Sequence, residues 1–256
     1  MRRTAMKSVS HCSARHLVLT LSTLCIATAA VAPASASEFS VTPIRAELKP
    51  GALSETITVT NHASARLRVA VKLVEWTQDA TGKDIYRDSN DLVYFPRQLE
   101  LPPDSKRLVR VGLKVPAGVV ERTYRLFIEE QPEPVAASGQ SQVAFYFRFG
   151  VPIFVAPAVP KAQPEVLEPT LTKGKLALVV RNRGNHHFRL TKVTVSDGGD
   201  YVKELQGWYS LAGSERTYAD DVPPVVCQQA KTLSMALEGE GIRIERQLHV
   251  DPASCL

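Results

Sequence analysis

The chain has 256 residues, of which 44% are hydrophobic and 22% charged, and its formal net charge is +5. Four of the 31 basic residues and none of the 26 acidic residues lie in the first 36 positions, so the rest of the chain carries 27 basic residues against 26 acidic ones. A net charge near +1 excludes the strongly basic surface of a nucleic-acid-binding protein, and the composition does not indicate disorder.

Residues 1–36 are predicted to be a secretory signal peptide. A basic start is followed by an apolar run over residues 17–31 and by a small-residue cleavage site, ASA at 34–36. No apolar stretch after the leader reaches the roughly 20 residues that a membrane-spanning helix needs. We therefore expect an exported protein without stable membrane insertion.

Residues 39–131 show the alternation of apolar and polar residues that is typical of short β-strands. The main segments are FSVTPIRAEL, ETITVTN, LRVAVKLVEW, KRLVRVGLKV and TYRLFIEEQ, with turns at residues 49–51 and 79–83. With the segment that follows they make about seven or eight strands over roughly 120 residues, the spacing of an immunoglobulin-like sandwich.

A long apolar segment, SQVAFYFRFGVPIFVAP, follows at residues 141–157. Val143, Phe145, Phe147 and Phe149 alternate with other residues, and the pattern predicts one strand over residues 143–155, roughly 40 Å long at about 3.3 Å per residue. Phe154 has the opposite parity, so aromatic side chains need shelter on both faces. Either the whole strand is ordinary core, or part of it binds a partner.

Residues 156–166 contain three prolines and are predicted to be a stiff hinge. Beyond it, KLALVVRN and FRLTKVTV are predicted to form a hairpin that turns at residues 182–186, and two later strands complete a second, smaller β-sandwich. Cys227 and Cys255 remain after the leader, which holds Cys12 and Cys25. An even pair in an oxidising compartment predicts one disulfide, and two unpaired buried thiols are the alternative.

No pattern of catalytic residues is present: the sequence has no G-x-S-x-G elbow, no glycine-rich phosphate loop and no H-E-x-x-H motif. Four histidines follow the leader, among them the neighbours His186 and His187. Adjacent residues on a strand point to opposite faces, so this pair is not expected to bind one metal ion. We expect no enzyme activity, no cofactor and no metal site.

The segments TPIRAEL, TITVTN, VEWTQD, FPRQLELPPDSKRLVRV and TYRLFIEEQP, followed by the long strand, resemble the PapD-like family of periplasmic pilus and fimbrial assembly chaperones. The sequence of the long strand resembles the archaic branch of the chaperone–usher pathway more than its best-known branch. The resemblance implies an all-β fold of two immunoglobulin-like β-sandwich domains in an L-shaped, boomerang arrangement. The expected divisions are a signal peptide at 1–36, an N-terminal domain at 37–157 that ends in the long donor strand, and a C-terminal domain at 158–256.

The function that this resemblance implies is a non-enzymatic chaperone of the periplasm. It would capture and stabilise pilus or fimbrial subunits by donor-strand complementation and deliver them to an outer-membrane usher. Val143, Phe145, Phe147 and Phe149 are the residues expected to fill the hydrophobic groove of a subunit. The alternative is a secreted structural or adhesive pilus component with two sandwiches and no chaperone activity. A carbohydrate-binding or hydrolytic β-protein would show rows of exposed tryptophan or paired catalytic carboxylates, which this sequence lacks.

The family also anchors the C-terminal carboxylate of the subunit between its domains with two basic residues. Arg45 matches the first of them, and an arginine suits this role because its forked donors fit a carboxylate. The second is a lysine on the long strand, and Pro152 stands at that position here. Arg125 is the preferred substitute and Arg148 the next, followed by Arg97, although each of them is also compatible with an ordinary surface arginine.

The arginine by which this family often links its two domains is absent as well, because Ala156 stands at its position. Glu129 and Glu130 are the candidates for charged residues that pair with others in the cleft between the two domains.

Overall fold

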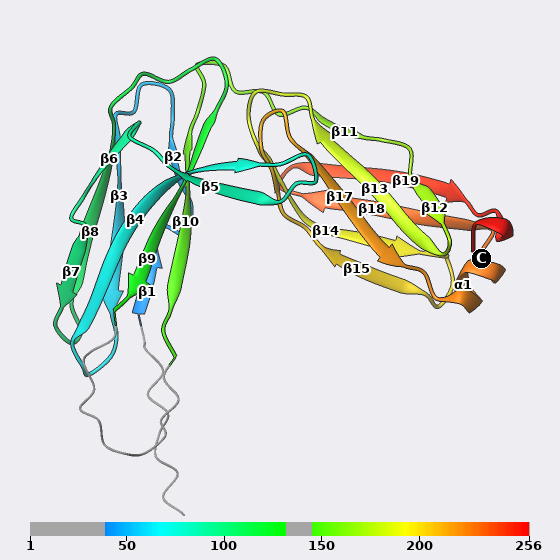
Figure 1. Ribbon diagram of the computed structural model, residues 1–256, viewed down its shortest axis with the longest axis horizontal. Helices are drawn as coiled ribbons and strands as arrows, with labels where there is room; N and C mark the ends of the chain where they lie inside the picture. The colour runs from blue at the N-terminus through cyan, green and yellow to red at the C-terminus, as the bar shows by residue number, and fades with distance from the viewer. Residues whose placement is uncertain (1–38, 132–144, 256) are drawn as a thin grey trace, which may run out of the picture. The chain divides into compact units, whose positions relative to one another are not determined.

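The computed structural model describes residues 39–131 and 145–255, which belong to one compact unit (Figure 1). The predicted signal peptide and Val143 lie outside the described residues. Within those residues the chain is almost entirely β-strand, with one short helix, α1 (Pro224–Gln229), and a 3-10 turn at Pro252–Cys255. None of the described helices has the length and apolarity needed to cross a bilayer.

Two sheets form the first sandwich. One has the order β1-β3-β8-β6, and the other has the order β2-β10-β9-β4-β5 with β7 also paired to β4. The bounds are β1 (Phe39–Thr42), β2 (Ala46–Leu48), β3 (Ser54–Asn61), β4 (Leu67–Gln78), β5 (Asp84–Asp88), β6 (Leu92–Phe95), β7 (Gln98–Leu101), β8 (Lys106–Leu113), β9 (Arg122–Glu130) and β10 (Arg148–Val155). Alternate side chains such as Ile57, Val109 and Leu126 are fully buried between the sheets, as expected for a sandwich core.

The predicted first strand, residues 39–48, is divided between the two sheets. β1 pairs antiparallel with β3 in one sheet, whereas β2 pairs parallel with β10 in the other. Pro43, Ile44 and Arg45 lie in the break, where proline supplies no backbone donor to a ladder. The apolar alternation continues through the break, so the sequence pattern alone did not reveal it.

The long strand is shorter than predicted, because β10 begins at Arg148 and Phe145, Tyr146 and Phe147 are not in a strand. The neighbouring strand explains this limit. β9 pairs with β10 from Glu129 opposite Arg148 to Arg122 opposite Val155, and it ends at Glu130. A last backbone hydrogen bond joins the Glu130 N–H to the Phe147 carbonyl at 3.0 Å, and beyond it β9 offers no further partner.

The second sandwich also has two sheets, one of β11, β13, β12 and β17 and one of β15, β14, β18 and β19, with β16 also paired to β14. Their bounds are β11 (Pro164–Val166), β12 (Thr170–Thr172), β13 (Lys175–Asn182), β14 (Phe188–Ser196), β15 (Val202–Gln206), β16 (Tyr209–Ser210), β17 (Glu215–Asp221), β18 (Thr232–Gly239) and β19 (Ile242–His249). Leu178, Leu190 and Leu237 lie in its buried core. The fold class of two all-β sandwiches is thus confirmed.

The predicted hairpin over residues 175–196 is wrong, because β13 and β14 belong to different sheets of the second sandwich. The intervening turn crosses from one sheet to the other and is held by Asn182, which is 1% exposed. Its side-chain amide donates to the carbonyls of His186 and Ser210, and its Oδ1 accepts from the Gly184 N–H. Asn61 has the same position at the end of β3 and holds the turn after it in the same way, donating to the carbonyl of Ala65.

The single disulfide prediction is confirmed. Cys227 of α1 is bonded to Cys255 of the 3-10 turn, 28 residues later, so the alternative of two free thiols is wrong. Cys227 is completely buried and belongs to the core of the second sandwich. The bond ties the end of the chain to that core.

Candidate functional site

The C-terminal part of β10 is enclosed on both faces. Val151, Ile153 and Val155 point into the core of the first sandwich. Phe154 points the other way and is fully buried in a second cluster with Trp76, Tyr209 and Leu211. This cluster joins β4 and β10 of the first sandwich to β16 and the following turn of the second.

Polar contacts surround that cluster and hold the two sandwiches together. The side chain of Gln78 donates to the Tyr209 carbonyl at 2.9 Å and accepts from the Leu211 N–H at 3.1 Å. The Trp208 indole donates to the carboxylate of Asp84 at 3.1 Å. These residues supply the link for which the sequence suggested Glu129 or Glu130. Glu129 instead pairs with Arg148 inside the first sandwich, and its Oε1 lies 2.6 Å from the Arg148 Nε.

The N-terminal part of the same segment is open. Phe145 is 75% exposed, Tyr146 51% and Phe147 39%. The free edge of β10 adjoins them, because β2 pairs only with Ile153–Val155 and no strand in the described part of the chain pairs with the edge before them. An exposed apolar segment continuous with an unpaired strand edge is the feature that recruits an additional strand.

Phe149 lies between the two parts and is half-buried. Its ring contacts Phe39 of β1 edge-to-face, with 4.9 Å between ring centroids, and packs against the core of the first sandwich. Phe149 therefore already has an apolar partner within the chain, and its contact with a subunit stays a prediction.

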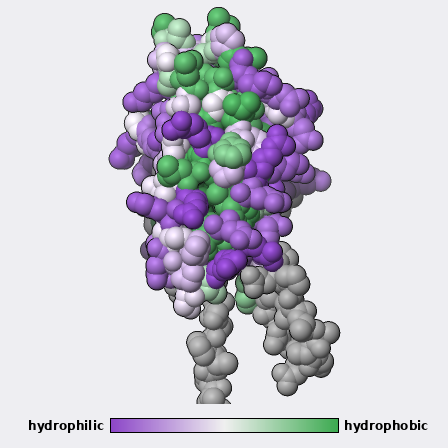
Figure 2. Space-filling model, turned by 90° about the vertical axis from the view of Figure 1, so that its left-hand side faces the viewer, coloured by the Kyte–Doolittle hydropathy of each residue, from purple (hydrophilic) through white to green (hydrophobic). Residues whose placement is uncertain are grey.

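Other apolar side chains are exposed on β6 and β8, namely Val93, Phe95 and Leu108. Figure 2 shows one face of the protein on which apolar residues gather along the middle between hydrophilic ones. These positions lie in the sheet that does not contain β10. They provide matched apolar control positions for experiments on Phe145 and Phe147.

Arg45 lies at the mouth of an open pocket of about 410 Å³ that is also lined by His186, Arg189 and Glu240. Its Nη1 is 2.7 Å from one carboxylate oxygen of Glu240, and the Nη1 of Arg189 is 3.8 Å from the other. The hydrogen bond from Arg45 to Glu240 raises the pKa of the guanidinium, which is ionised in any case. About one third of the Arg45 side chain is exposed, so the group remains within reach of a ligand.

Arg125 is placed differently from the expectation of an open anchor. It lies opposite Pro152 in the β9–β10 register, at the position of the missing lysine, but it is only 5% exposed. Its guanidinium stacks over Trp76 at 3.9 Å, and its Nη1 donates to the Gly150 carbonyl at 3.1 Å. Asp84 is 3.8 Å from its Nη2. The Arg125 side chain packs against Trp76 and Trp208 where the two sandwiches meet, and its role as an anchor stays a prediction.

Arg148 and Arg97 do not line the pocket at Arg45. Arg148 pairs with Glu129 and lies 3.7 Å over the ring of Phe127, while Arg97 lies 5.2 Å over the ring of Tyr94. Arg189 is the cation that sequence reasoning missed. Its position in β14 gave no signal, because only the folded chain brings it to the same carboxylate as Arg45.

A cluster of four side chains, which the sequence did not predict, lies at this pocket. Glu47, His186 and His187 line the pocket, and Glu121 lies against the two histidines. Glu121 is buried between His186 and His187, whose Nδ1 atoms lie 2.6 Å and 2.9 Å from its carboxylate oxygens. Burial acts to raise the pKa of the Glu121 carboxyl, but the contacts with His186 and His187 outweigh burial and leave that pKa below its usual range. The contact with Glu121 in turn raises the pKa of His186.

The rule that adjacent strand residues point apart does not apply to His186 and His187, because both precede β14 and lie in the turn held by Asn182. That turn is also tied to the first sandwich. The Glu121 N–H donates to the carbonyl of Asn185 at 2.9 Å, and the His187 N–H donates to the Glu121 carboxylate at 2.9 Å. The His187 ring stacks on Phe154 with 3.7 Å between centroids.

Comparison with known families identifies the first sandwich. Residues 38–161 match the model of the pili and flagellar-assembly chaperone PapD N-terminal domain. The first sandwich therefore belongs to the family of PapD N-terminal domains. The match spans β1 to β10 and therefore includes both Arg45 and the open segment.

Solved structures of pilus chaperones share the two-sandwich fold of this PapD-like chain. The CsuC–CsuE chaperone–tip adhesion subunit pre-assembly complex of the archaic Csu pili of Acinetobacter baumannii matches with a TM-score of 0.60 and 18% identity, covering 82% of this chain and 98% of that chain. The CupB2 chaperone of Pseudomonas aeruginosa matches with a TM-score of 0.55 and 16% identity, covering 83% and 100%. A Salmonella enterica complex of the SafA pilin and the SafB chaperone matches with a TM-score of 0.54 and 16% identity, covering 83% and 97%.

Proposed function

We propose that this PapD-like protein is a periplasmic chaperone that captures pilus or fimbrial subunits by donor-strand complementation and passes them to an outer-membrane usher. Membership of the family supports the chaperone role and the periplasmic location. No catalytic step is part of the proposal, since capture needs only backbone pairing and apolar burial.

The observation that carries the proposal is the division of the segment from Phe145 to Val155. The residues of its second half are buried within the protein, while Phe145 and Phe147 are exposed beside the unpaired edge of β10. A subunit strand that pairs with this edge gains a backbone ladder and buries those rings. Full burial of each ring stabilises the complex by about 1.5–3 kcal/mol.

Arg45 is proposed to bind the C-terminal carboxylate of the captured subunit. It is exposed at an open pocket and already holds a carboxylate, that of Glu240, at hydrogen-bond distance. The terminal carboxylate of a partner offers the same two oxygens to the guanidinium. Arg189 lies within 3.8 Å of the Glu240 carboxylate and adds positive charge at this place.

The test is co-purification of a candidate pilus subunit with the chaperone from periplasmic extract. The double variant Phe145→Ser, Phe147→Ser is expected to lose the complex, because it loses the apolar side chains for the groove. Arg45→Ala is expected to lose it too while the free protein stays folded. Phe95→Ser is the matched control, since Phe95 is 77% exposed on the other sheet. Wild-type yields of complex with the double variant would refute the donor-strand role.

A further inference from the structure

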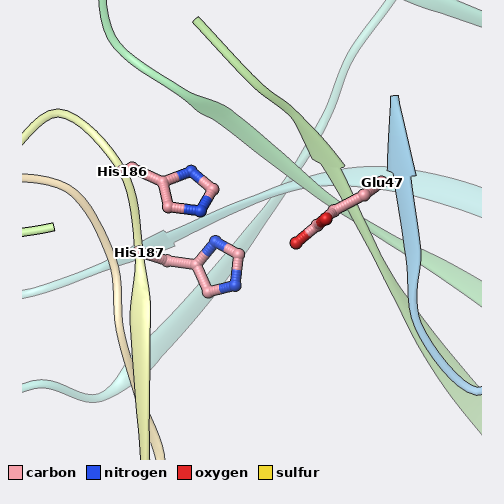
Figure 3. A group of neighbouring side chains, drawn as sticks. All are labelled: Glu47, His186 and His187. Carbon is pink, nitrogen blue, oxygen red and sulfur yellow. The ribbon is translucent and has the colours of Figure 1, made fainter. Parts of the chain in front are cut away.

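Three potential metal ligands from separate parts of the chain converge beside the Arg45 pocket. Glu47 lies on β2, and His186 and His187 lie in the turn before β14. One ligand atom of each lies within 4.8 Å of those of the other two. Figure 3 shows the Glu47 carboxylate pointing toward the two imidazole rings. Glu47 and both histidines also line the open pocket.

A buried carboxylate lies against both imidazoles and is hydrogen-bonded to that of His187. Glu121, whose side chain is fully buried, contacts the Nδ1 atom of His186 and that of His187. Because each Nδ1 faces this carboxylate, the Nε2 atoms are the nitrogens that remain for a ligand. Metal-binding histidines characteristically have this arrangement, in which a second carboxylate fixes the tautomer and the ring orientation.

The charges of the cluster match a dication. Imidazoles that bind a metal through Nε2 are neutral, so Glu47 and Glu121 contribute a charge of −2 to the metal-bound site, while Arg45, Arg189 and Glu240, which line the same pocket, contribute a net +1. Glu121 is buried and Glu47 is partly buried, which makes uncompensated negative charge costly. A divalent ion between Glu47 and the imidazoles compensates both carboxylates at once.

The donor set also selects the kind of ion. Two imidazoles with one carboxylate suit Zn²⁺ and related transition ions, whereas Mg²⁺ and Ca²⁺ prefer oxygen ligands. In a tetrahedral site with zinc bonds of about 2.0–2.2 Å, the ligand atoms lie about 3.3–3.6 Å from one another, so the three ligands move closer together when they bind the ion. The Glu47 side chain makes no hydrogen bond or ion pair with other described residues, so it is free to turn toward the two imidazoles.

We propose that Glu47, His186 and His187 form a binding site for a divalent transition-metal ion, with Zn²⁺ as the best fit and Glu121 as the orienting carboxylate. The three ligands leave a fourth coordination position open toward the pocket. The ion joins β2 of the first sandwich to the β13–β14 turn of the second. It therefore strengthens the attachment of the two sandwiches, adding to the aromatic cluster, the Arg45–Glu240 ion pair and the contacts of Glu121.

The test uses the mature protein without a histidine tag, freed of metal with a chelator and titrated with ZnCl₂ by calorimetry. We expect one ion per chain, a higher melting temperature with Zn²⁺ and no comparable rise with MgCl₂. Co²⁺ is expected to give the visible absorption of a low-coordinate cobalt site with imidazole ligands. Absence of zinc binding, or binding without a change in melting temperature, would overturn the proposal.

Variants locate the ion. Glu47→Gln is expected to weaken Zn²⁺ binding about tenfold or more without unfolding the protein, because its carboxylate has no structural partner among the described residues. His186→Gln is expected to have an equal or larger effect. His249→Gln removes a histidine outside the cluster and is expected to bind as the wild type does. Unchanged affinity in Glu47→Gln and His186→Gln would show adventitious binding elsewhere and reject the site.

Discussion

The two halves of the segment from Phe145 to Val155 are both rich in apolar residues but have opposite surroundings. Phe154 is fully buried against Trp76, Tyr209 and the stacked ring of His187. Phe147 has the same ring, but it is 39% exposed next to a free strand edge. The difference comes from the partners, because β2 and the second sandwich reach only the C-terminal half.

This contrast indicates how the protein keeps an apolar segment available. The enclosed half fixes the position of the strand with core contacts on both faces, so the exposed half leaves the domain at a defined place and direction. A segment that was exposed along its whole length would lack that support. Three experiments on the free protein test this contrast. The first compares the two halves by the free energy of unfolding, and the other two test the contacts that enclose Phe154.

The largest effect is expected from replacing the enclosed ring. Phe154→Ala should lower the free energy of unfolding by about 3–5 kcal/mol, because it removes a fully buried aromatic side chain. Phe147→Ala is the matched control and should change it by no more than about 0.5 kcal/mol. Urea denaturation of both variants measures the difference. Equal losses would mean that Phe147 is also part of the core in solution.

Reduction of the disulfide tests the second sandwich, which shelters Phe154. Breaking the Cys227–Cys255 bond should lower the free energy of unfolding of this sandwich by about 2–4 kcal/mol, because the reduced unfolded chain is less restricted. Thermal melting with and without reductant, followed by tryptophan fluorescence, reports on the junction through Trp76 and Trp208. An identical melting curve after reduction would contradict a stabilising role for the bond.

A smaller effect is expected at the polar edge of the junction. Glu121→Gln should cost about 1–3 kcal/mol, because it weakens buried contacts to His186 and His187 and loosens the ring that stacks on Phe154. The measurement is made in the presence of chelator, so that metal binding does not contribute. Glu129→Gln is the control, since its pair with Arg148 is partly exposed to solvent and should contribute no more than about 1 kcal/mol. A Glu121→Gln loss no larger than that of Glu129→Gln would argue against this junction contact.

Burial explains why the sequence was a better guide to some arginines than to others. The family resemblance predicts that Arg45 anchors a carboxylate; the structure places this residue at an open pocket, and its anchoring role stays a prediction. Arg125 was favoured because it shares a strand face with Phe127, and at Arg125 this face is covered by Trp76 and by Trp208 of the second sandwich. The tryptophan rings that enclose Arg125 come from positions 76 and 208, which no local pattern connects with position 125.

The sequence by itself determined the all-β class, most of the strand positions and the cysteine pairing, whereas the exposure of Phe145 and Phe147 was seen only in the structure. These depend on local alternation, composition and the small number of cysteines. Only the tertiary structure decided where the first strand changes sheet, where β10 ends its pairing, and that Glu47, Glu121, His186 and His187 meet. Each of those outcomes is fixed by backbone partners and packing between residues far apart in the chain, and a local pattern carries no information about such partners.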